Sequence, residues 1–425
     1  MKGGQGTLSA ATSTTSRLTG PYPSSRAEPE GVVAPATTNL RRSAHCRIRT
    51  VMGLRSCTWA HAGRTGVLAK STDVTELVQL LTPEGERLDH PDYPLELTAE
   101  QVQGLFRDMS LARRLDTEAM ALQRQGELGL WAPLLGQEAA QIGAAAALAP
   151  ADFVFPSYRE HGIAMARGIT VSELLKIWRG TEHGGWDAGK VRVAGYAIVI
   201  GAQTLHAVGY AMGVQRDDAA EAVLACFGDG ATSQGDVNEA FVWAGAQNAP
   251  VVFLCQNNQW AISARLETQT RVPLYRRASG FGFPGVRVDG NDAFACLAVT
   301  RAALERARAG EGPMLIEAFT YRMSAHTSSD DPTRYRESAE LEEWRLKDPI
   351  ERVRAYLTKN ELAGDDFFES VDAEADELGR RIRHECRALP DPAPQAIFEH
   401  VYAGVHAQLA EECAAFTSYL DGFVH

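Results

Sequence analysis

The chain has 425 residues, of which 45% are hydrophobic, and its formal net charge is −12. This length allows one large α/β domain or two smaller ones, and the composition is typical of a globular protein. The negative charge argues against non-specific nucleic-acid binding, which requires a basic face. No apolar run approaches the roughly 20 residues of a membrane-spanning helix. The seven scattered cysteines favour reduced thiols over a disulfide or zinc framework.

Residues 1–68 differ in composition from the remainder of the chain. They are rich in Ser, Thr, Ala, Gly and Arg, and Glu28 and Glu30 are their only acids. We predict a disordered extension, followed by a lead-in segment over residues 69–97. A mitochondrial transit peptide and a start codon assigned too early, with Met52 as a later candidate, are the alternatives. The abundance of Ala, Arg and Gly throughout the chain favours a bacterial cytoplasmic protein with an extended or misassigned N-terminus.

Residues 98–345 alternate helical and strand patterns, which predicts a mostly parallel sheet covered by helices on both faces. Thr98 and Gln101 form a capping box at the start of a helix. An Ala-rich helix is expected over 136–150, a strand over 153–155, a helix from 172, and a glycine-rich loop at the site over 180–197. A small-residue helix follows, and a later strand over 314–319 precedes His326. Residues 346–425 have helical periods and are expected to form a helical C-terminal region.

The most informative stretch begins with the apolar residues 223–227, which predict a buried strand. Gly228-Asp229-Gly230 ends that strand in a tight turn, and helical spacing follows over 232–247. A second apolar strand over 251–255 ends at Asn257-Asn258. Because this strand–helix–strand unit makes the two strands parallel, their C-terminal ends should meet at the same edge of the sheet.

That geometry predicts a cation and phosphate site at this edge. Asp229 offers a charged oxygen, Asn258 a neutral one, and the main-chain carbonyl of Trp260 a third, which suits Mg²⁺. The helix N-terminus after Gly230 should point free N–H groups at a diphosphate. The plain alternative is an acidic turn without a metal. The glycines do not form a dinucleotide fingerprint, since Ser233 stands where a third glycine would be required.

Other candidate residues also follow strand ends. Tyr158 and Arg159 come just after the strand over 153–155, and the arginine fork suits a diphosphate. A surface Arg159 paired with Glu160 is the alternative. His326 suits phosphate binding or proton transfer. Asp330 and Asp331 suggest a second metal, solvated loop charges, or charges that neutralise Arg334 and Arg336 and order the loop. The tryptophans at 131, 178, 186, 243 and 260 are expected in the core or an interface.

Taken in order, these segments resemble the α subunit of the E1 component of 2-oxo acid dehydrogenase complexes. The shared motifs run from about residue 95 to near the C-terminus and include RQGELGLWAPLLGQEAAQIGAA, VFPSYREHG, FGDGATSQGDVNEAF, CQNNQWAIS and YRMSAHTSSDDPTRYR. The resemblance implies a three-layer thiamine-diphosphate-binding α/β fold with a helical C-terminal extension. It also implies oxidative decarboxylation of pyruvate or a branched-chain 2-oxo acid, and transfer of the acyl unit to a lipoyl group of E2.

The resemblance assigns roles residue by residue. It places Mg²⁺ on Asp229, Asn258 and the Trp260 carbonyl, and it makes Tyr158, Arg159 and His326 the catalytic set around the diphosphate and the reacting centre. The cofactor-binding residues that it implies are Tyr158, Arg159, Ile200, Gly228, Asp229, Gly230, Ala231, Asn258 and His326. Gln203 matches a position near a monovalent-cation site in some relatives. Gln256 stands where the branched-chain pattern has Arg, which puts that phosphate contact in doubt. Thr327 replaces a regulatory serine, so kinase control is not expected.

A separate E1 β subunit is implied as the partner, in an α₂β₂ heterotetramer whose sites lie between α and β. That β subunit is expected to supply the carboxylate that activates the cofactor's aminopyrimidine. Acetoin dehydrogenase E1 α, a non-catalytic cofactor-binding paralogue and a nicotinamide-binding dehydrogenase domain are the rival interpretations. The substrate side chain is not readable from the sequence, because a methylene discriminates by only about 1–3 kcal/mol.

Overall fold

The structure is a computed structural model that describes residues 77–423, apart from positions 183 and 400. The predicted N-terminal extension over 1–68, and the beginning of the predicted lead-in over 69–97, lie outside the described residues. The predicted domain limits at 98 and 346 stay a prediction. Within the described part of the chain, no helix is long and apolar enough to cross a membrane.

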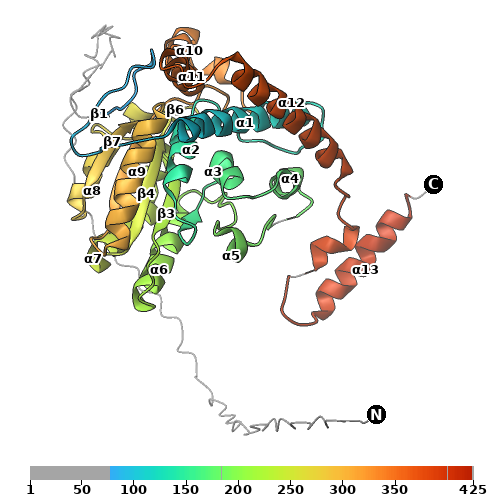
Figure 1. The fold of residues 1–425 in the computed structure, drawn as a ribbon. Helices are drawn as coiled ribbons and strands as arrows, with labels where there is room; N and C mark the ends of the chain where they lie inside the picture. Colours follow the sequence, from blue (N-terminus) through green and yellow to red (C-terminus); the bar gives the residue numbers. More distant parts are fainter. Residues whose placement is uncertain (1–76, 183, 400, 424–425) are drawn as a thin grey trace, which may run out of the picture. The chain divides into compact units, whose positions relative to one another are not determined.

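A six-stranded sheet forms the centre of the fold (Figure 1), and each of its strand pairs is parallel. The strand order is β1-β7-β8-β4-β3-β2. The strands are β1 (Leu77–Val78), β2 (Phe153–Phe155), β3 (Val223–Gly228), β4 (Val251–Asn257), β7 (Gly285–Asp289) and β8 (Met314–Phe319). A separate antiparallel pair joins β5 (Trp260–Ala261) to β6 (Ala264–Arg265). The predicted parallel sheet is therefore confirmed.

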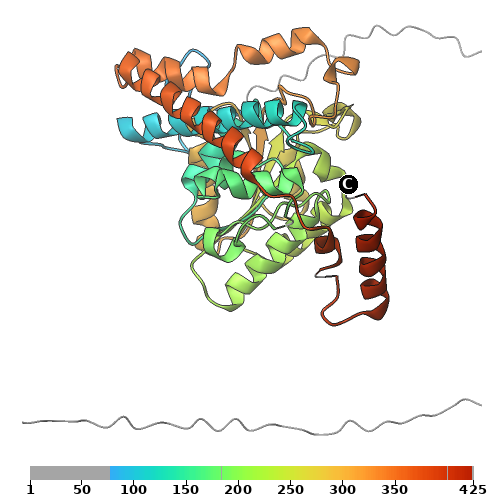
Figure 2. The same cartoon turned by 90° about the vertical axis from the view of Figure 1, so that its right-hand side faces the viewer.

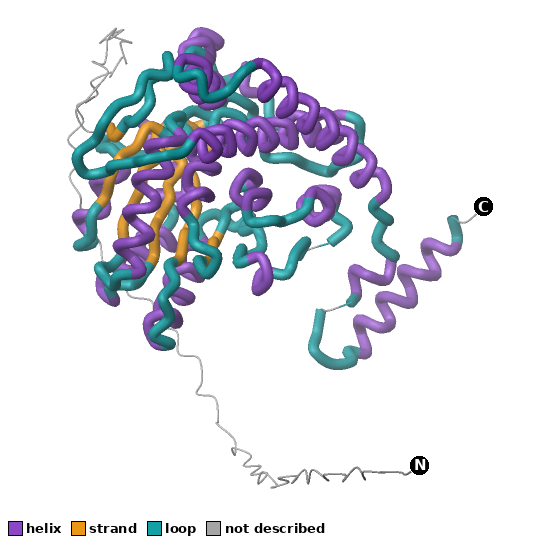
Figure 3. The backbone as a smooth tube through the Cα atoms, in the orientation of Figure 1, coloured by secondary structure: helices purple, strands orange, loops and turns teal. Residues whose placement is uncertain are grey.

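Two helical layers enclose the sheet, as the tube drawing in Figure 3 shows. Alternate residues of β3 explain the arrangement, since successive strand side chains point to opposite faces. Leu224 and Cys226 join the core beneath α1 (Ala99–Arg124), α2 (Glu138–Ala147) and α9 (Ala293–Arg308). Val223, Ala225 and Phe227 join the core beneath α6 (Ala202–Arg216) and α7 (Gly235–Gln247). Both faces of the strand are buried, which is why its sequence reads as a continuous apolar run. The predicted three-layer α/β class is confirmed.

The helices begin where the capping residues lie. Thr98 and Gln101 form the predicted capping box, Asp292 caps α9, and Asp348 caps α11 with Pro349 in its first turn. The helices are α1 (Ala99–Arg124), α2 (Glu138–Ala147), α3 (His161–Ala166), α4 (Val171–Arg179), α5 (Ala188–Val191), α6 (Ala202–Arg216), α7 (Gly235–Gln247), α8 (Arg277–Gly280), α9 (Ala293–Arg308), α10 (Ser338–Arg345), α11 (Pro349–Lys359), α12 (Asp365–Ala388) and α13 (Ala407–Asp421).

Three element predictions need correction. The helix after the glycine turn begins at Gly235 rather than 232, because a 3₁₀ helix, η2 (Asp229–Ser233), occupies the turn first. The Ala-rich helix ends at Ala147, before Pro150. The predicted loop over 180–197 contains the short helix α5. The side chain of Asp187 caps the N-terminus of this helix. The many glycines of this segment indicated a loop, so the sequence did not predict this four-residue helix.

The C-terminal region is helical, as expected. α12 packs along α1, and the two helices exchange ion pairs such as Arg107–Glu374. Beyond the proline-rich linker, η6 (Pro394–Phe398) and α13 lie side by side in both views (Figures 1 and 2), with the Phe398 and Phe416 rings 5.8 Å apart. Cys226 and Cys255 are buried free thiols in β3 and β4, which agrees with the expected reduced cysteines.

Candidate active site

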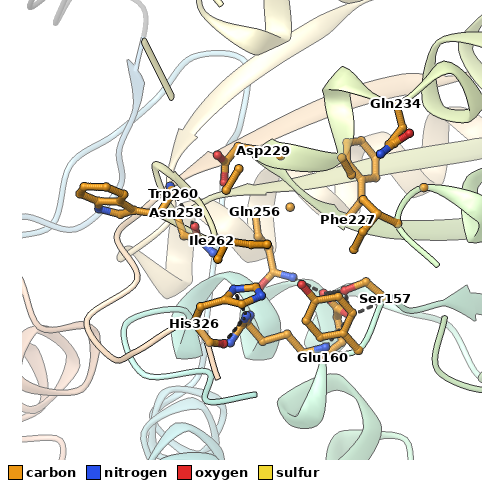
Figure 4. Close-up of a pocket in the computed structure, with 18 of the residues that line it drawn as sticks. Ser157, Glu160, Phe227, Asp229, Gln234, Gln256, Asn258, Trp260, Ile262 and His326 are labelled. Carbon is orange, nitrogen blue, oxygen red and sulfur yellow. Dashed lines mark hydrogen bonds between the residues drawn. The ribbon is translucent and has the colours of Figure 1, made fainter. Parts of the chain in front are cut away.

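A cavity of about 250 Å³ lies at the C-terminal ends of β3 and β4 (Figure 4). The catalytic, cofactor-binding and metal-binding residues that the resemblance implied all line it: Tyr158, Arg159, Ile200, Gly228, Asp229, Gly230, Ala231, Asn258, Trp260 and His326. They come from the exits of β2, β3, β4 and β8 and from the start of α6. None of the described residues of the predicted loop over 180–197 lines the cavity, but the Ala197 N–H donates to the carbonyl of Ser157, a lining residue, at 2.9 Å.

Strand register brings Asp229 and Asn258 together. β3 and β4 are parallel with Gly228 opposite Gln256, so the residues that follow each strand emerge at the same edge. Asp229 is only 1% exposed, and Gln269 is the one side chain among the described residues that donates to its carboxyl, from Nε2 at the long distance of 3.5 Å. Burial raises the pKa of Asp229 to about 6. The described residues therefore leave this buried carboxyl without an ion-pair partner.

The donor set around Asp229 fits a hard divalent cation. A buried carboxylate is costly unless a cation compensates it. The Asn258 side chain and the Trp260 carbonyl add neutral oxygens, and the Trp260 carbonyl already accepts from the Nη1 of Arg322 at 3.3 Å. The described chain contains no cluster of three or more His, Cys, Asp or Glu side chains that could hold a metal. A cation here would hence take further ligands from water or a bound anion, as Mg²⁺ commonly does.

The glycine turn is shaped for close approach. A Cβ on Gly230 would lie 2.7 Å from the Cβ of Ala261, so the protein itself requires glycine there. A Cβ on Gly228 would meet nothing within 4 Å, so its side faces open space where a ligand fits. The first turn of η2 starts at Asp229, and N–H groups at a helix start have no partner within the helix. The turn can therefore receive an anion.

Arg159 and Tyr158 form the opposite wall. Arg159 is 6% exposed, and its Nη2 donates to the backbone carbonyl of His326 at 2.9 Å. Its guanidinium carbon lies 5.5 Å from the centre of the Tyr158 ring. The alternative of a surface Arg159–Glu160 pair is wrong, because both residues are buried and the Glu160 carboxylate accepts from Ser157 and Gln256.

His326 is neutral in this setting. Its Nδ1 faces the Nη2 of Arg159 at 3.3 Å and the Nη1 of Arg322 at 3.5 Å. Guanidinium groups only donate, so Nδ1 must accept and the ring proton resides on Nε2. Burial, followed by the two arginine charges, lowers the pKa of His326 to about 3. The imidazole thus enters the site as a neutral hydrogen-bond donor.

The loop that carries His326 is held by its own polar residues. Asp330 accepts from the His326 backbone N–H at 2.8 Å and from the Tyr335 hydroxyl. Arg336 donates to the carbonyls of Arg322, Met323 and Ser324. Asp331 caps the short helix η5 (Pro332–Arg334). The acids of the loop therefore bind backbone and hydroxyl groups, and the described residues form no metal-binding cluster there, so the suggested second metal has no support.

Two glutamines that line the cavity have partners within the protein. Gln256 donates to Glu160 at 2.6 Å and accepts from Gln141 at 3.1 Å, so its side chain is engaged within the protein. Gln203 donates to the Cys226 carbonyl at 2.8 Å, while its buried Oε1 has no partner among the described residues. Because both polar groups of the Gln256 side chain already bind protein groups, we do not expect it to contact a phosphate.

The sequence missed several lining residues: Gln137, Ser157, Glu160, Gly201, Phe227, Gln234, Ala261 and Ile262. Most flank a motif already singled out, so proximity to strand ends was an available signal. Gln137 had none, because it reaches the cavity from the start of α2. Among the tryptophans, those at 131, 178 and 260 are buried as predicted, whereas Trp243 is 43% exposed on α7 and so is not a core residue.

Comparison with known proteins agrees with this site. Residues 107–393 match the family model described as the dehydrogenase E1 component. The chain is 47% identical over 335 residues to the 3-methyl-2-oxobutanoate dehydrogenase subunit alpha of Mycobacterium tuberculosis, covering 79% of this chain and 90% of the relative.

Two pyruvate dehydrogenase E1 component subunits alpha are also similar to this chain. The Acholeplasma laidlawii protein is 37% identical over 333 residues, covering 77% of this chain and 96% of that protein. The Staphylococcus epidermidis protein is 38% identical over 348 residues, covering 81% of this chain and 94% of that protein. With the family model covering most of its length, this chain belongs to the dehydrogenase E1 component family.

Proposed function

We propose that this chain is the α subunit of a 2-oxo acid dehydrogenase E1 component that binds thiamine diphosphate through Mg²⁺. One observation carries the proposal. Asp229, a buried carboxyl with no ion-pair partner among the described residues, lines the same cavity as Asn258 and Trp260. The dehydrogenase E1 family is thiamine diphosphate-dependent, and these three oxygens are the hard donors that a diphosphate-bound Mg²⁺ requires.

The proposed roles follow from the walls of the cavity. Asp229, Asn258 and the Trp260 carbonyl would hold Mg²⁺, and the backbone from Gly228 to Ala231 would receive the diphosphate. Arg159 and Tyr158 would face the diphosphate from the opposite wall, and Ile200 would pack against the middle of the cofactor. When bound, thiamine diphosphate supplies the carbon nucleophile and the electron sink that decarboxylation of a 2-oxo acid requires.

His326 and Arg159 would act on the reacting groups. His326 can donate its Nε2 proton to an oxygen that gains negative charge, because both arginines keep its Nδ1 an acceptor. Arg159 contributes a fixed positive charge in a buried place, where electrostatic interactions are stronger than in water. The chain thereby provides orientation, a proton donor and charge, while the cavity limits access of water.

A branched-chain 2-oxo acid is the substrate that we favour. The relative named for 3-methyl-2-oxobutanoate is 47% identical to this chain, against 37–38% for two relatives named for pyruvate. These names do not favour the acetoin alternative.

The named subunits are α chains, so a β subunit is the expected partner. We further propose an α₂β₂ heterotetramer with sites between α and β, and a lipoyl group of E2 as the acyl acceptor. The bacterial relatives favour the bacterial cytoplasm over a mitochondrial matrix as the location.

The test is reconstitution of α with its β subunit, thiamine diphosphate and Mg²⁺. We expect CO₂ release from 3-methyl-2-oxobutanoate with a higher kcat/KM than from pyruvate, and acylation of a free lipoyl domain. Either subunit alone serves as the control. Release of no CO₂ from either acid would refute the catalytic proposal and favour a non-catalytic paralogue. Calorimetric titration of the same complex with NAD in place of thiamine diphosphate tests the nicotinamide alternative.

A further inference from the structure

Gln137 forms a hydrogen bond with Asn258 that has no part in the proposed reaction. It is the residue immediately before α2, it is 1% exposed, and its side chain makes no capping hydrogen bond to that helix. Its Oε1 instead accepts from the Nδ2 of Asn258 at 3.1 Å. A buried glutamine side chain is thus committed to a residue on a different element, 121 positions away in the sequence.

The position of Gln137 is fixed by its neighbours. Gly136 has a φ of +95°, and a Cβ there would lie 2.3 Å from the Tyr321 carbonyl oxygen, so only glycine fits. The Gly136 N–H donates to Glu138 at 2.9 Å, and the Gly136 carbonyl accepts from the Thr320 hydroxyl at 2.6 Å. The backbone that presents Gln137 is therefore held from both sides.

The contacts also fix which way the Asn258 amide faces. Its Oδ1 accepts from the Trp260 N–H at 3.3 Å while its Nδ2 donates to Gln137. Flipping the amide would place oxygen against oxygen at Gln137 and two donors together at Trp260. Gln137 itself is biased by its Nε2, which lies 3.5 Å from the Leu134 carbonyl oxygen. The three hydrogen bonds therefore form one chain, in which each amide can donate and accept in only one orientation.

This orientation matters for a cation, because an amide oxygen binds one and an amide nitrogen does not. The Oδ1 of Asn258 keeps a second lone pair after accepting from Trp260. We propose that Gln137 is a positioning residue for the cation site, which holds the Asn258 amide with its oxygen available to the metal. The inference depends on the proposed function, since it concerns the same metal site.

The test is a double-mutant cycle on the assembled α and β subunits. Mn²⁺ affinity in the presence of thiamine diphosphate is measured from the free-Mn²⁺ signal in electron paramagnetic resonance. In the Asn258 background, Gln137→Leu removes the acceptor and leaves a buried N–H unpaired, and we expect about a tenfold loss of affinity. In an Asn258→Asp background, both terminal atoms of the side chain at position 258 are oxygens, so either one can bind the metal whichever way the group is turned. There we expect Gln137→Leu to change affinity by less than about twofold.

Gln137→Glu is the conservative control, because its carboxylate still accepts from Nδ2. It should retain affinity better than Gln137→Leu, and the KM for Mg²⁺ should rise in the leucine variant with kcat unchanged at saturating metal. Equal losses in both backgrounds would mean that Gln137 acts only through general structure, and would overturn the inference. If the wild-type complex binds no Mn²⁺ with thiamine diphosphate, the proposed function itself fails, which separates the two results.

Discussion

The β3–β4 edge and the loop after β8 reach the same cavity by different means. At the edge, parallel register places Asp229 and Asn258, and backbone hydrogen bonds of a buried sheet maintain that register. In the loop, side chains bind backbone groups, as Asp330 and Arg336 do. The difference matches the proposed roles: the hydrogen-bonded sheet edge would bind the cation, while a loop held by side-chain contacts would present His326.

The largest expected effect is at the sheet edge. Asp229→Asn removes the only charged protein ligand of the proposed Mg²⁺ site, so metal-dependent binding of thiamine diphosphate should weaken on the order of 100-fold or more. The free protein should unfold at no lower temperature, because a buried carboxyl without an ion-pair partner is removed. Calorimetric titration and thermal unfolding check both. Unchanged cofactor affinity would remove Asp229 from the metal site.

His326→Ala tests the loop directly. Loss of a positioned proton donor should reduce acylation of the lipoyl domain by roughly 100-fold, while Mg²⁺ affinity and the unfolding temperature stay close to wild type. The control variant is His384→Ala, at an exposed position on α12. Rates of lipoyl acylation and decarboxylation are measured on the reconstituted complex. Turnover equal to wild type would exclude a role for His326 in the reaction.

Arg336→Met tests how the loop is held. The guanidinium of Arg336 donates to three consecutive backbone carbonyls, and loss of these hydrogen bonds should lower activity about tenfold. Limited proteolysis should then cleave the loop faster, with metal binding retained. Arg334→Met, at an exposed position of the same loop, is the matched control. If both variants behave alike, the carbonyl contacts do not order the loop.

The last prediction concerns the pH dependence of stability rather than activity, through Asp116. Burial raises the pKa of Asp116 to about 6 from the ordinary 3.8, although Trp131, Leu134 and Leu135 donate to its carboxylate. The folded state therefore binds more protons between these values, and its stability from this group falls as pH rises from about 4 to about 6, by up to about 3 kcal/mol.

Thermal unfolding of wild type and Asp116→Asn across that pH range measures the contribution. The variant should lose less stability than wild type as pH rises, whatever its absolute unfolding temperature. A pH dependence identical to that of wild type would show that Asp116 is ionised at its ordinary pKa in the fold.

Local signals explain how much of the fold the sequence predicted. β8 spans the expected residues 314–319, and the capping box of Thr98 and Gln101 starts its helix as expected. The errors fall where local signals compete. At the glycine turn, the 3₁₀ helix η2 precedes α7, and at α5 an aspartate cap outweighed the surrounding glycines.

The sequence by itself determined the chemistry of the sheet edge, because strand periodicity and parallel crossover fix which residues leave the strands together. Only the tertiary structure decided that Gln137 binds Asn258, that two arginines face the Nδ1 of His326, and that Asp229 lacks an ion-pair partner among the described residues. These contacts join elements far apart in the chain. They depend on side-chain packing in three dimensions, for which local periodicity carries no signal.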